Sequence, residues 1–394
     1  MALTVGLLFD FYFDLNDDVL MKDILSGAYT GTPAGHNIQM LYPVSALISL
    51  FYRLFRGADW YGIFLCGAQF CCIFLILWRS LVMLRRAGVQ VWQRVLVVLT
   101  ETVVILSVLL PHLVYVQYTV TVALLSGTAA FLFLTGESRK NDLTACIMIW
   151  LAYLIRSEML LLTLPVVAVA FFIRWRMEQQ GGQLRKYILL GVILLAGIAA
   201  GALANRLAYS SPQWQEFVSF FDHRTEVYDF QGIPAYQENR AFYDSIGLSE
   251  DEQALLVNYN FGLDQEIDAD CMGKIADYAA AHNADEKPLA EKAQAALKAY
   301  IYRLHHLGEP QTFEYPQTDA PWNLLTAVLF LAALALYLTD HTHQPGRARY
   351  RIVLWVFLLF AADSALWGYI LIRGRDPIRI THSLYLMEMV VLGG

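Results

Sequence analysis

The sequence predicts an all-α polytopic membrane protein, and three observations lead to this fold class. Of its 394 residues, 57% are hydrophobic and only 16% are charged. The mean hydropathy is +0.44, which excludes a soluble globular domain. Several apolar runs reach the roughly 20 residues that a helix needs to cross about 30 Å of hydrocarbon. Only one long polar segment, residues 205–320, interrupts them.

We expect about ten transmembrane helices. The first, residues 1–13, is shorter than a full span, and the last begins near Ser383, so both are expected to be incomplete. The eight spans between them are predicted at 59–84, 91–110, 113–134, 143–155, 159–173, 187–205, 321–339 and 350–371.

Residues 38–56 are apolar but contain Pro43 and Arg53, and the run 59–84 follows at once. We predict that 38–56 lies as a helix in the outer membrane interface. With this assignment the basic loops, such as the one with Arg85 and Arg86, fall on the cytoplasmic side, as the positive-inside rule requires. If 38–56 crossed instead, these loops would lie outside.

The chain is predicted to contain three parts. The segment 205–320 has eight basic and 20 acidic residues and is too long for an ordinary connection, so we expect a small, mainly helical domain outside the cytoplasm, between spans 7 and 8. The parts are a transmembrane module, 1–204, with an acidic first outer loop, 14–58; the outer domain, 205–320; and C-terminal helices, 321–394, with an arginine-rich outer loop, 372–382.

The first candidate site is the acidic cluster of Asp14, Asp17 and Asp18, which follows the first span and precedes a glycine-rich loop that ends at His36. Carboxylates at a membrane boundary are costly unless water or a cation reaches them, so such a cluster is a functional candidate. The alternative is an ordinary solvated loop.

A second polar feature interrupts the apolar run 143–174 at Arg156, Ser157 and Glu158. Two short helices that meet at a polar turn explain it better than one long span. Arg156 and Glu158 either belong to a site or only neutralise each other at the membrane edge.

The outer domain interleaves aromatic and charged residues, among them Arg224, Asp229 and Tyr236. Sugar-binding surfaces use this mixture, because rings stack on the apolar faces of pyranoses while charged groups bond hydroxyls. The same residues could equally form the small core of the domain.

The loop before the last span contains Arg373, Arg375, Arg379 and His382. Arginines on the outer side run against the positive-inside rule, so an anion is expected to balance them. The planar guanidinium suits a phosphate or pyrophosphate on a lipid, and the alternative is anchoring to lipid headgroups.

Other signals exclude several functions. The sequence lacks the phosphate-binding and hydrolase motifs GxxxxGK[ST], GxGxxG, HExxH and GxSxG, and its five cysteines have no zinc or disulfide spacing. The acidic balance makes nucleic acid an unsuitable partner. The intramembrane residues Glu101, His112 and Asp363 are expected to pack against neighbours.

The acidic cluster after span one, the sequence Leu154-Ile155-Arg156-Ser157-Glu158 and the long loop 205–320 together resemble the GT-C superfamily of membrane glycosyltransferases. The resemblance in layout covers nearly the whole chain. It implies an active site at the outer face of the cell membrane, a polyprenyl-phosphate or polyprenyl-pyrophosphate sugar as donor, and a cell-surface glycan or lipid-linked acceptor. It also implies a catalytic carboxylate in the first outer loop.

Carried over residue by residue, the resemblance implies Asp17 as the general base, Asp18 as a group that orients the acceptor or polarises Asp17, and Asp14 as the reserve candidate. The late arginines would hold the lipid phosphate. A divalent cation, Mg²⁺ or Mn²⁺, at Asp17 and Asp18 stays open. The other predicted substrate contacts are His36, Arg156, Glu158, Arg224, Asp229, Tyr236, Arg373, Arg375, Arg379 and His382.

Three alternatives remain at this stage. A polysaccharide polymerase or ligase would depend on the outer arginines more than on Asp17 and Asp18. A lipid-linked glycan flippase or other transporter would line a central cavity with its charges. A receptor without catalysis would bind its ligand through the outer domain alone.

Overall fold

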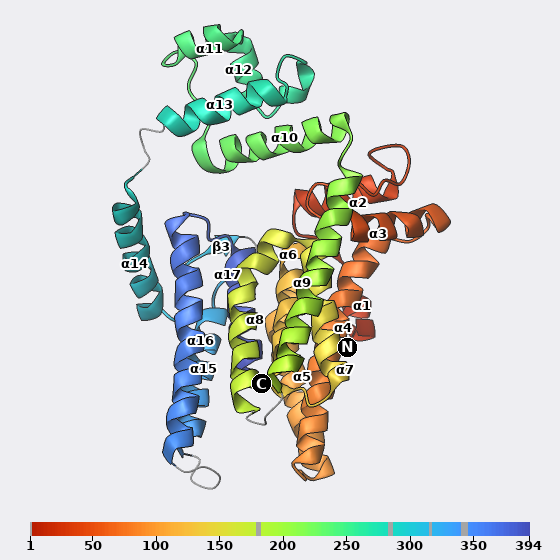
Figure 1. Cartoon of the computed structure of the whole chain (residues 1–394), viewed down its shortest axis with the longest axis vertical. Helices are drawn as coiled ribbons and strands as arrows, with labels where there is room; N and C mark the ends of the chain where they lie inside the picture. The colour runs from red at the N-terminus through yellow and green to blue at the C-terminus, as the bar shows by residue number, and fades with distance from the viewer. Residues whose placement is uncertain (1, 179–182, 283–286, 315–316, 340–345) are drawn as a thin grey trace. The chain divides into compact units, whose positions relative to one another are not determined.

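The computed structural model describes residues 2–178, 183–282, 287–314, 317–339 and 346–394. It contains two compact units (Figure 1). The membrane unit consists of Met1–Ala204 and Lys292–Gly394, and the polar unit is Asn205–Glu291. The prediction that the polar domain extends to residue 320 is therefore wrong, because the chain rejoins the membrane unit at Lys292.

Within the described residues, six helices are long and apolar enough to span a membrane, fewer than the predicted ten. They are α4 (Trp60–Arg86), α5 (Val91–Val114), α6 (Tyr118–Thr135), α8 (Ser157–Met177), α9 (Gln183–Ala208) and α16 (Gly346–Ile372). The membrane unit also contains α1 (Ala2–Leu8), α2 (Asn16–Ser26), α3 (Tyr42–Leu54), α7 (Arg139–Ile155), α14 (Leu289–His305), α15 (Trp322–Thr339) and α17 (Ile378–Gly393).

The first predicted span forms a short helix in the described residues. Helix α1 has seven residues, about 10 Å at 1.5 Å per residue, and the chain then extends into strand β1 (Tyr12–Phe13). Strand β1 pairs in parallel with β2 (Tyr115–Val116), which directly follows α5. A second short pair, β3 (Phe313–Glu314) and β4 (Gln317–Thr318), precedes α15.

Helix α6 forms the centre of the membrane unit, and 94% of its most apolar window is buried. It packs against α4, α7, α8 and α17. A helix that is apolar on every side has no face suited to water, so it is covered all round by other helices. Its small residues allow close approach: the α-carbon of Gly127 faces the side chains of Met387 and Val390 on α17.

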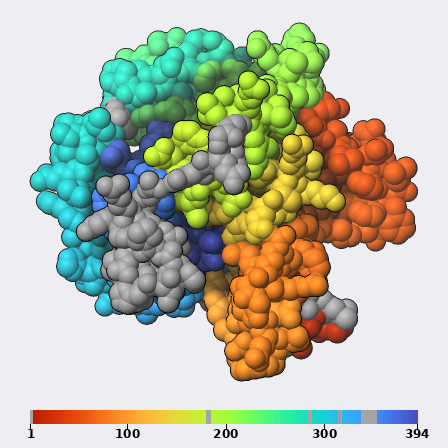
Figure 2. All heavy atoms as spheres, turned by 60° about the horizontal axis from the view of Figure 1, so that its bottom comes forward, coloured from red at the N-terminus to blue at the C-terminus, as the bar shows by residue number. Residues whose placement is uncertain are grey.

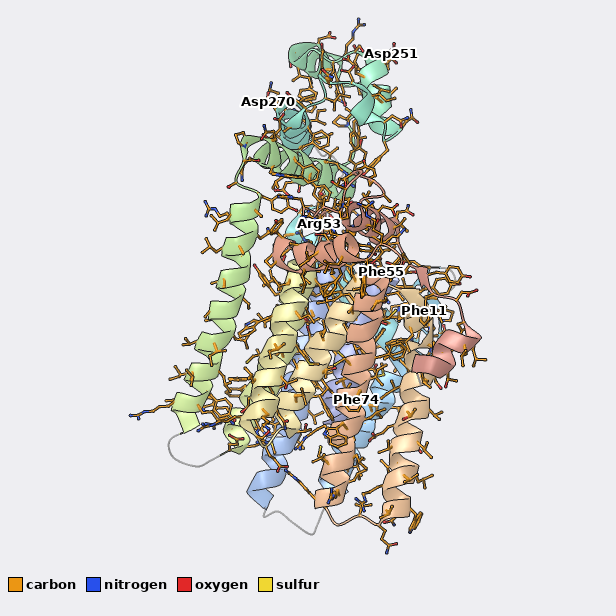
Figure 3. All side chains as sticks on the ribbon, turned by 90° about the vertical axis from the view of Figure 1, so that its right-hand side faces the viewer. Phe11, Arg53, Phe55, Phe74, Asp251 and Asp270 are labelled. Atoms are coloured by element: carbon orange, nitrogen blue, oxygen red, sulfur yellow. The ribbon has the colours of Figure 1, made fainter. Side chains whose placement is uncertain are left out.

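Helix α3 falls within the predicted interfacial segment 38–56, and α2 and α3 lie across the ends of the long helices (Figure 1). Figure 3 shows Arg53 and Phe55 at that end and Phe74 further along α4. The turn into α4 is fixed by Asp59, whose side chain accepts hydrogen bonds from the Gly62 backbone N–H and the Tyr52 hydroxyl. Asp59 thus caps the start of α4 and links it to α3 through Tyr52.

The opposite ends of the long helices are joined by ion pairs. Arg79 on α4 bonds Glu137, and Lys186 on α9 bonds Asp142 on α7 at 3.1 Å.

The turn between α4 and α5, coloured orange, projects from its neighbours (Figure 2). Only 11% of the apolar window of α5 is buried, so most of this helix is left to contact lipid.

Helices α7 and α9 pack closely where Gly197 faces Trp150. The Trp150 indole N–H donates to the Leu194 carbonyl oxygen at 3.0 Å, and a β-carbon at Gly197 would overlap the indole ring. We expect Gly197→Ala to destabilise the fold by about 1–3 kcal/mol, the usual cost of overpacking. The measurement is the thermal midpoint of the purified protein. Gly191→Ala, on the same helix with open space around it, is the matched control and should show no loss.

The polar unit is helical, as predicted from its sequence. It contains α10 (Pro212–Glu226), a π-helical turn (Val227–Gln231), α11 (Arg240–Ile246), α12 (Glu250–Val257), a 3₁₀ turn (Phe261–Leu263) and α13 (Ala269–His282). Helix α12 begins with a reciprocal capping box formed by Ser249 and Glu252. Its core is a separate apolar cluster centred on Tyr243, Leu256, Met272 and Ile275.

Candidate active site

The acidic cluster is fixed in place by the pairing of β1 with β2. The Asp14 backbone N–H continues this pairing and donates to the Val116 carbonyl oxygen at 3.1 Å. Helix α2 then begins at Asn16, so Asp17 and Asp18 lie in its first turn, where the helix dipole favours negative charge. The short parallel pair thus brings the N-terminal carboxyls to the start of α6, about 100 residues further along the chain.

Asp18 is fully buried because it shares one face of α2 with Met21 and Leu25. Its Oδ1 accepts a hydrogen bond from the Tyr61 hydroxyl at 2.7 Å and from the Tyr118 N–H at 3.3 Å, while Oδ2 has no partner among the described residues. Burial raises the pKa of Asp18 to about 8, against the lowering effect of these two donors. The carboxyl is therefore mostly protonated at neutral pH.

Tyr118 connects the acids to Arg156. Its hydroxyl donates to Asp17 Oδ2 at 3.3 Å and accepts from the Arg156 guanidinium at 3.2 Å. The same guanidinium bonds the Thr119 hydroxyl at 2.6 Å and lies 5.0 Å from the centre of the Tyr118 ring. Asp17 is half-buried, so it remains open to a ligand while Tyr118 holds one of its oxygens.

Arg156 lies between α7 and α8, and the predicted break into two helices is confirmed there. Its backbone is extended, with φ −158° and ψ 104°, and the second helix begins at Ser157. Glu158 is mostly exposed, and its carboxylate is 4.0 Å from the Arg156 guanidinium. This is a weak surface pair, and Arg156 makes its close contacts with α6 instead.

An arginine from the other end of the chain lies near the acids. The positive charge of Arg379 reaches Asp14, whose pKa is nonetheless raised, chiefly by burial and also by Glu314. Arg379 and Arg375 line a groove of about 350 Å³ together with Thr312, Glu314, Gly374, Asp376 and Pro377. The groove therefore contains two arginines, of which Arg379 lies within electrostatic reach of Asp14.

The predicted arginine-rich loop 372–382 is shorter than expected. Helix α16 ends at Ile372 and α17 begins at Ile378, not near Ser383. Arg379 and His382 are therefore helical residues. His382 is 98% buried and donates from Nε2 to the Thr318 carbonyl oxygen, while its Nδ1 faces His112 Nε2 at 2.7 Å. With both ring nitrogens engaged, His382 has a structural role rather than the predicted substrate contact.

Two further predicted residues, His36 and Arg373, lie against aromatic rings of the membrane unit. His36 lies against the Tyr42 ring, 4.9 Å between centres, and Arg373 lies 5.9 Å from the Tyr369 ring. The two residues belong to the membrane unit, as does the cluster.

The three predicted sugar contacts of the polar unit belong to a different unit from the acids. The Arg224 guanidinium lies over the Phe221 and Tyr259 rings, at 5.0 and 5.2 Å. Tyr236 stacks on Tyr243 and packs against the core, and Asp229 lies on the π-helical turn. For Tyr236 the structure favours the core interpretation that the sequence left open.

The described residues do not form a protein-only metal cage, since no three His, Cys, Asp or Glu side chains among them lie close enough to hold an ion. Asp18 Oδ1 is already engaged by Tyr61 and Tyr118. The divalent cation at Asp17 and Asp18 stays a prediction, and the chemistry below uses no metal.

The buried carboxyl of Asp18 has a consequence for stability. Between about pH 4 and 8 the unfolded carboxyl is ionised while the folded one stays protonated, so unfolding free energy falls as pH rises, by up to about 1.4 kcal/mol per pH unit. Asp18→Asn keeps the acceptor for Tyr61 but does not titrate. We expect the difference in thermal midpoint, variant minus wild type, to increase between pH 5 and pH 8. Asp23→Asn, on α2 outside the cluster, is the control.

No known protein family and no curated protein matches the chain. Among solved structures it is similar to the crystal structure of ArnT from Cupriavidus metallidurans bound to undecaprenyl phosphate, with a TM-score of 0.39 and 13% sequence identity. The match covers 100% of this chain and 76% of that one. The functional proposal therefore rests on the residues of this chain.

Proposed function

We propose that the chain is a membrane glycosyltransferase that moves a sugar from a polyprenyl-phosphate or polyprenyl-pyrophosphate donor to a glycan or lipid-linked acceptor. One observation carries the proposal: an accessible carboxylate, Asp17, lies in the same cluster as the guanidinium groups of Arg156 and Arg379. A base and a phosphate-binding cation are the two groups that this displacement needs.

In the proposed reaction Asp17 takes the proton of the acceptor hydroxyl as its oxygen attacks the anomeric carbon. The bond from that carbon to the phosphate oxygen breaks, and its electron pair stays on the phosphate. Arg379 and Arg375, at the groove beside Asp14, bind the phosphate and stabilise its growing charge. A single displacement of this kind inverts the anomeric centre.

The other residues of the cluster orient Asp17. Tyr118 donates to one oxygen of Asp17 and is itself held by Arg156, so the carboxylate is kept in one rotamer. Asp18, protonated and buried, fixes the adjacent Tyr61 and the first residue of α6. In this proposal Asp18 is a positioning residue, as the resemblance implied, and Asp14 stays the reserve base.

The test is transfer by the purified full chain. Polyprenyl-phosphoryl and polyprenyl-pyrophosphoryl sugars, each with a radiolabelled sugar, are incubated with lipid-linked and glycan acceptors, and products are separated from donor. We expect label in the acceptor with an inverted anomeric centre. Label that stays on the donor, together with movement of the donor across a vesicle membrane, would favour the flippase alternative.

The proposed site lies on the outer side of the membrane, because the basic ends of α4 and α8 lie at the other ends of these helices. Single cysteines at Glu158 and at Arg86 in a cysteine-free background would test this. A membrane-impermeant maleimide added to intact cells should label residue 158 and not residue 86, and the reverse pattern would place the site inside.

A further inference from the structure

A cavity of about 460 Å³ lies among α14, α15, α16 and α17, apart from the acidic cluster. Its walls are mainly apolar, with Phe330, Leu331, Phe357 and Phe360 among them. Leu331 and Phe357 are 67% and 63% exposed, so the cavity borders the surface that faces lipid. Its size is in the range of small-molecule sites, which are about 300–1,000 Å³.

Two carboxyl groups line this apolar space. Asp363 on α16 is 96% buried and Glu388 on α17 is 98% buried. Both residues line the same cavity, so the two carboxyl groups share one apolar space. Asp363 Oδ1 and Glu388 Oε1 have no hydrogen-bond partner among the described residues. An unsatisfied buried oxygen is costly, so the pair favours a ligand with a hydrogen-bond donor, which none of the described residues supplies.

The chemistry of the pair limits what can bind. Two carboxyls buried in one apolar cavity do not both ionise, so together they have up to one negative charge. Arg303, the cation that also lines the cavity, is already bound to Asp319 and Asp376. A phosphate would face this negative charge, whereas an ammonium group would offer donors to both free oxygens and balance the charge.

We propose that this cavity is a second binding site, which takes an amphiphile with one apolar chain and a protonated amine. The chain lies along the wall of Phe330 and Phe357, and the ammonium donates to Asp363 Oδ1 and Glu388 Oε1. The site is separate from the proposed phosphate groove of Arg375 and Arg379, and it does not depend on the transferase proposal.

The probe of the pair is dicyclohexylcarbodiimide, an apolar reagent that adds to protonated carboxyls within membranes. We expect it to modify Asp363 or Glu388 in the full chain, as located by peptide mass spectrometry. Hexadecylamine should protect these residues in a saturable way, while hexadecanol and hexadecyl phosphate protect at least about tenfold less well. Glu101, an intramembrane carboxyl on α5 outside the cavity, serves as the internal reference that the amine does not protect.

A second pair of variants tests the cavity without changing its charges. Ala327 lines the cavity, so the larger side chain of Ala327→Phe should fill it. We expect this variant to bind hexadecylamine at least about tenfold more weakly than the wild type. Ala332→Phe, at an exposed position of the same helix, is the matched control and should bind as the wild type does. Thermal midpoints verify that both variants fold.

Three results would overturn the proposal. Equal protection by hexadecanol would mean that only the chain is recognised. No modification of either carboxyl would mean that the cavity does not admit an apolar molecule as far as the pair. Amine protection that Ala327→Phe leaves unchanged would mean that the amine does not occupy this cavity. Protection is measured on the wild type and on Ala327→Phe, so the test changes neither carboxyl.

Discussion

Asp17→Asn is expected to lower kcat for sugar transfer by about 10²–10⁴-fold, the usual contribution of a positioned general base. Asparagine can still accept the hydrogen bond from the Tyr118 hydroxyl, so the contacts around α2 are kept while the proton acceptor is lost. The KM values for donor and acceptor should change little. Initial rates with a labelled donor, over a range of acceptor concentrations, separate the two parameters.

Asp23→Asn is the matched control for this experiment. Asp23 lies on the same helix and pairs with Lys22, outside the cluster, so its loss should leave transfer unchanged. Undiminished transfer by Asp17→Asn, with Asp14 and Asp18 intact, would show that Asp17 is not the base. The next variant would then be Asp14→Asn, since Asp14 also lies beside Arg379.

Hydropathy predicted the long helices well because each one is a local property of the sequence. The predicted spans 59–84 and 91–110 correspond to α4 and α5, and the break at Arg156 occurs where the charges interrupt the apolar run. Length and apolar composition decide these elements before any tertiary contact forms. The acidic cluster and Arg156 were visible for the same reason, as charges in an apolar setting.

The partners of those charges could not be predicted, since they come from distant parts of the chain. Tyr61 and Tyr118 look like ordinary aromatic residues of spans 2 and 4, and nothing local marks them as donors to Asp18 and Asp17. The pairing of β1 with β2 joins strands of two residues each, too short to give a period-two pattern. It is nevertheless the contact that places Asp14 beside α6.

Two errors had signals in the sequence. Pro377 directly precedes α17 with a φ of −62°, and a proline before an apolar run often marks the first turn of a helix. Most of helix α14 was assigned to the wrong unit, because it falls within the polar segment 205–320. Its Tyr300 hydroxyl bonds Ser364, and its Arg303 bonds Asp319, so one face of α14 belongs to the membrane unit.

Arg379→Gln is expected to lower kcat/KM for the lipid-linked donor by about 10²–10³-fold, the usual loss when one charged donor to a developing oxyanion is removed. Arg379→Lys should recover only part of this, because a lysine keeps the charge but loses the planar pair of donors. Rates at low donor concentration, compared for phosphate and pyrophosphate donors, give the measurement.

The control for this arginine is Arg176→Gln, an exposed residue about 30 Å along α8 from Arg156. It removes the same charge from the same unit, so it separates local phosphate binding from a general loss of positive charge. If both glutamine variants lowered kcat/KM equally, Arg379 would act only through the overall field. If Arg379→Gln alone were defective, and Asp17→Asn were defective in kcat, the base and the phosphate site would be assigned to opposite ends of one chain.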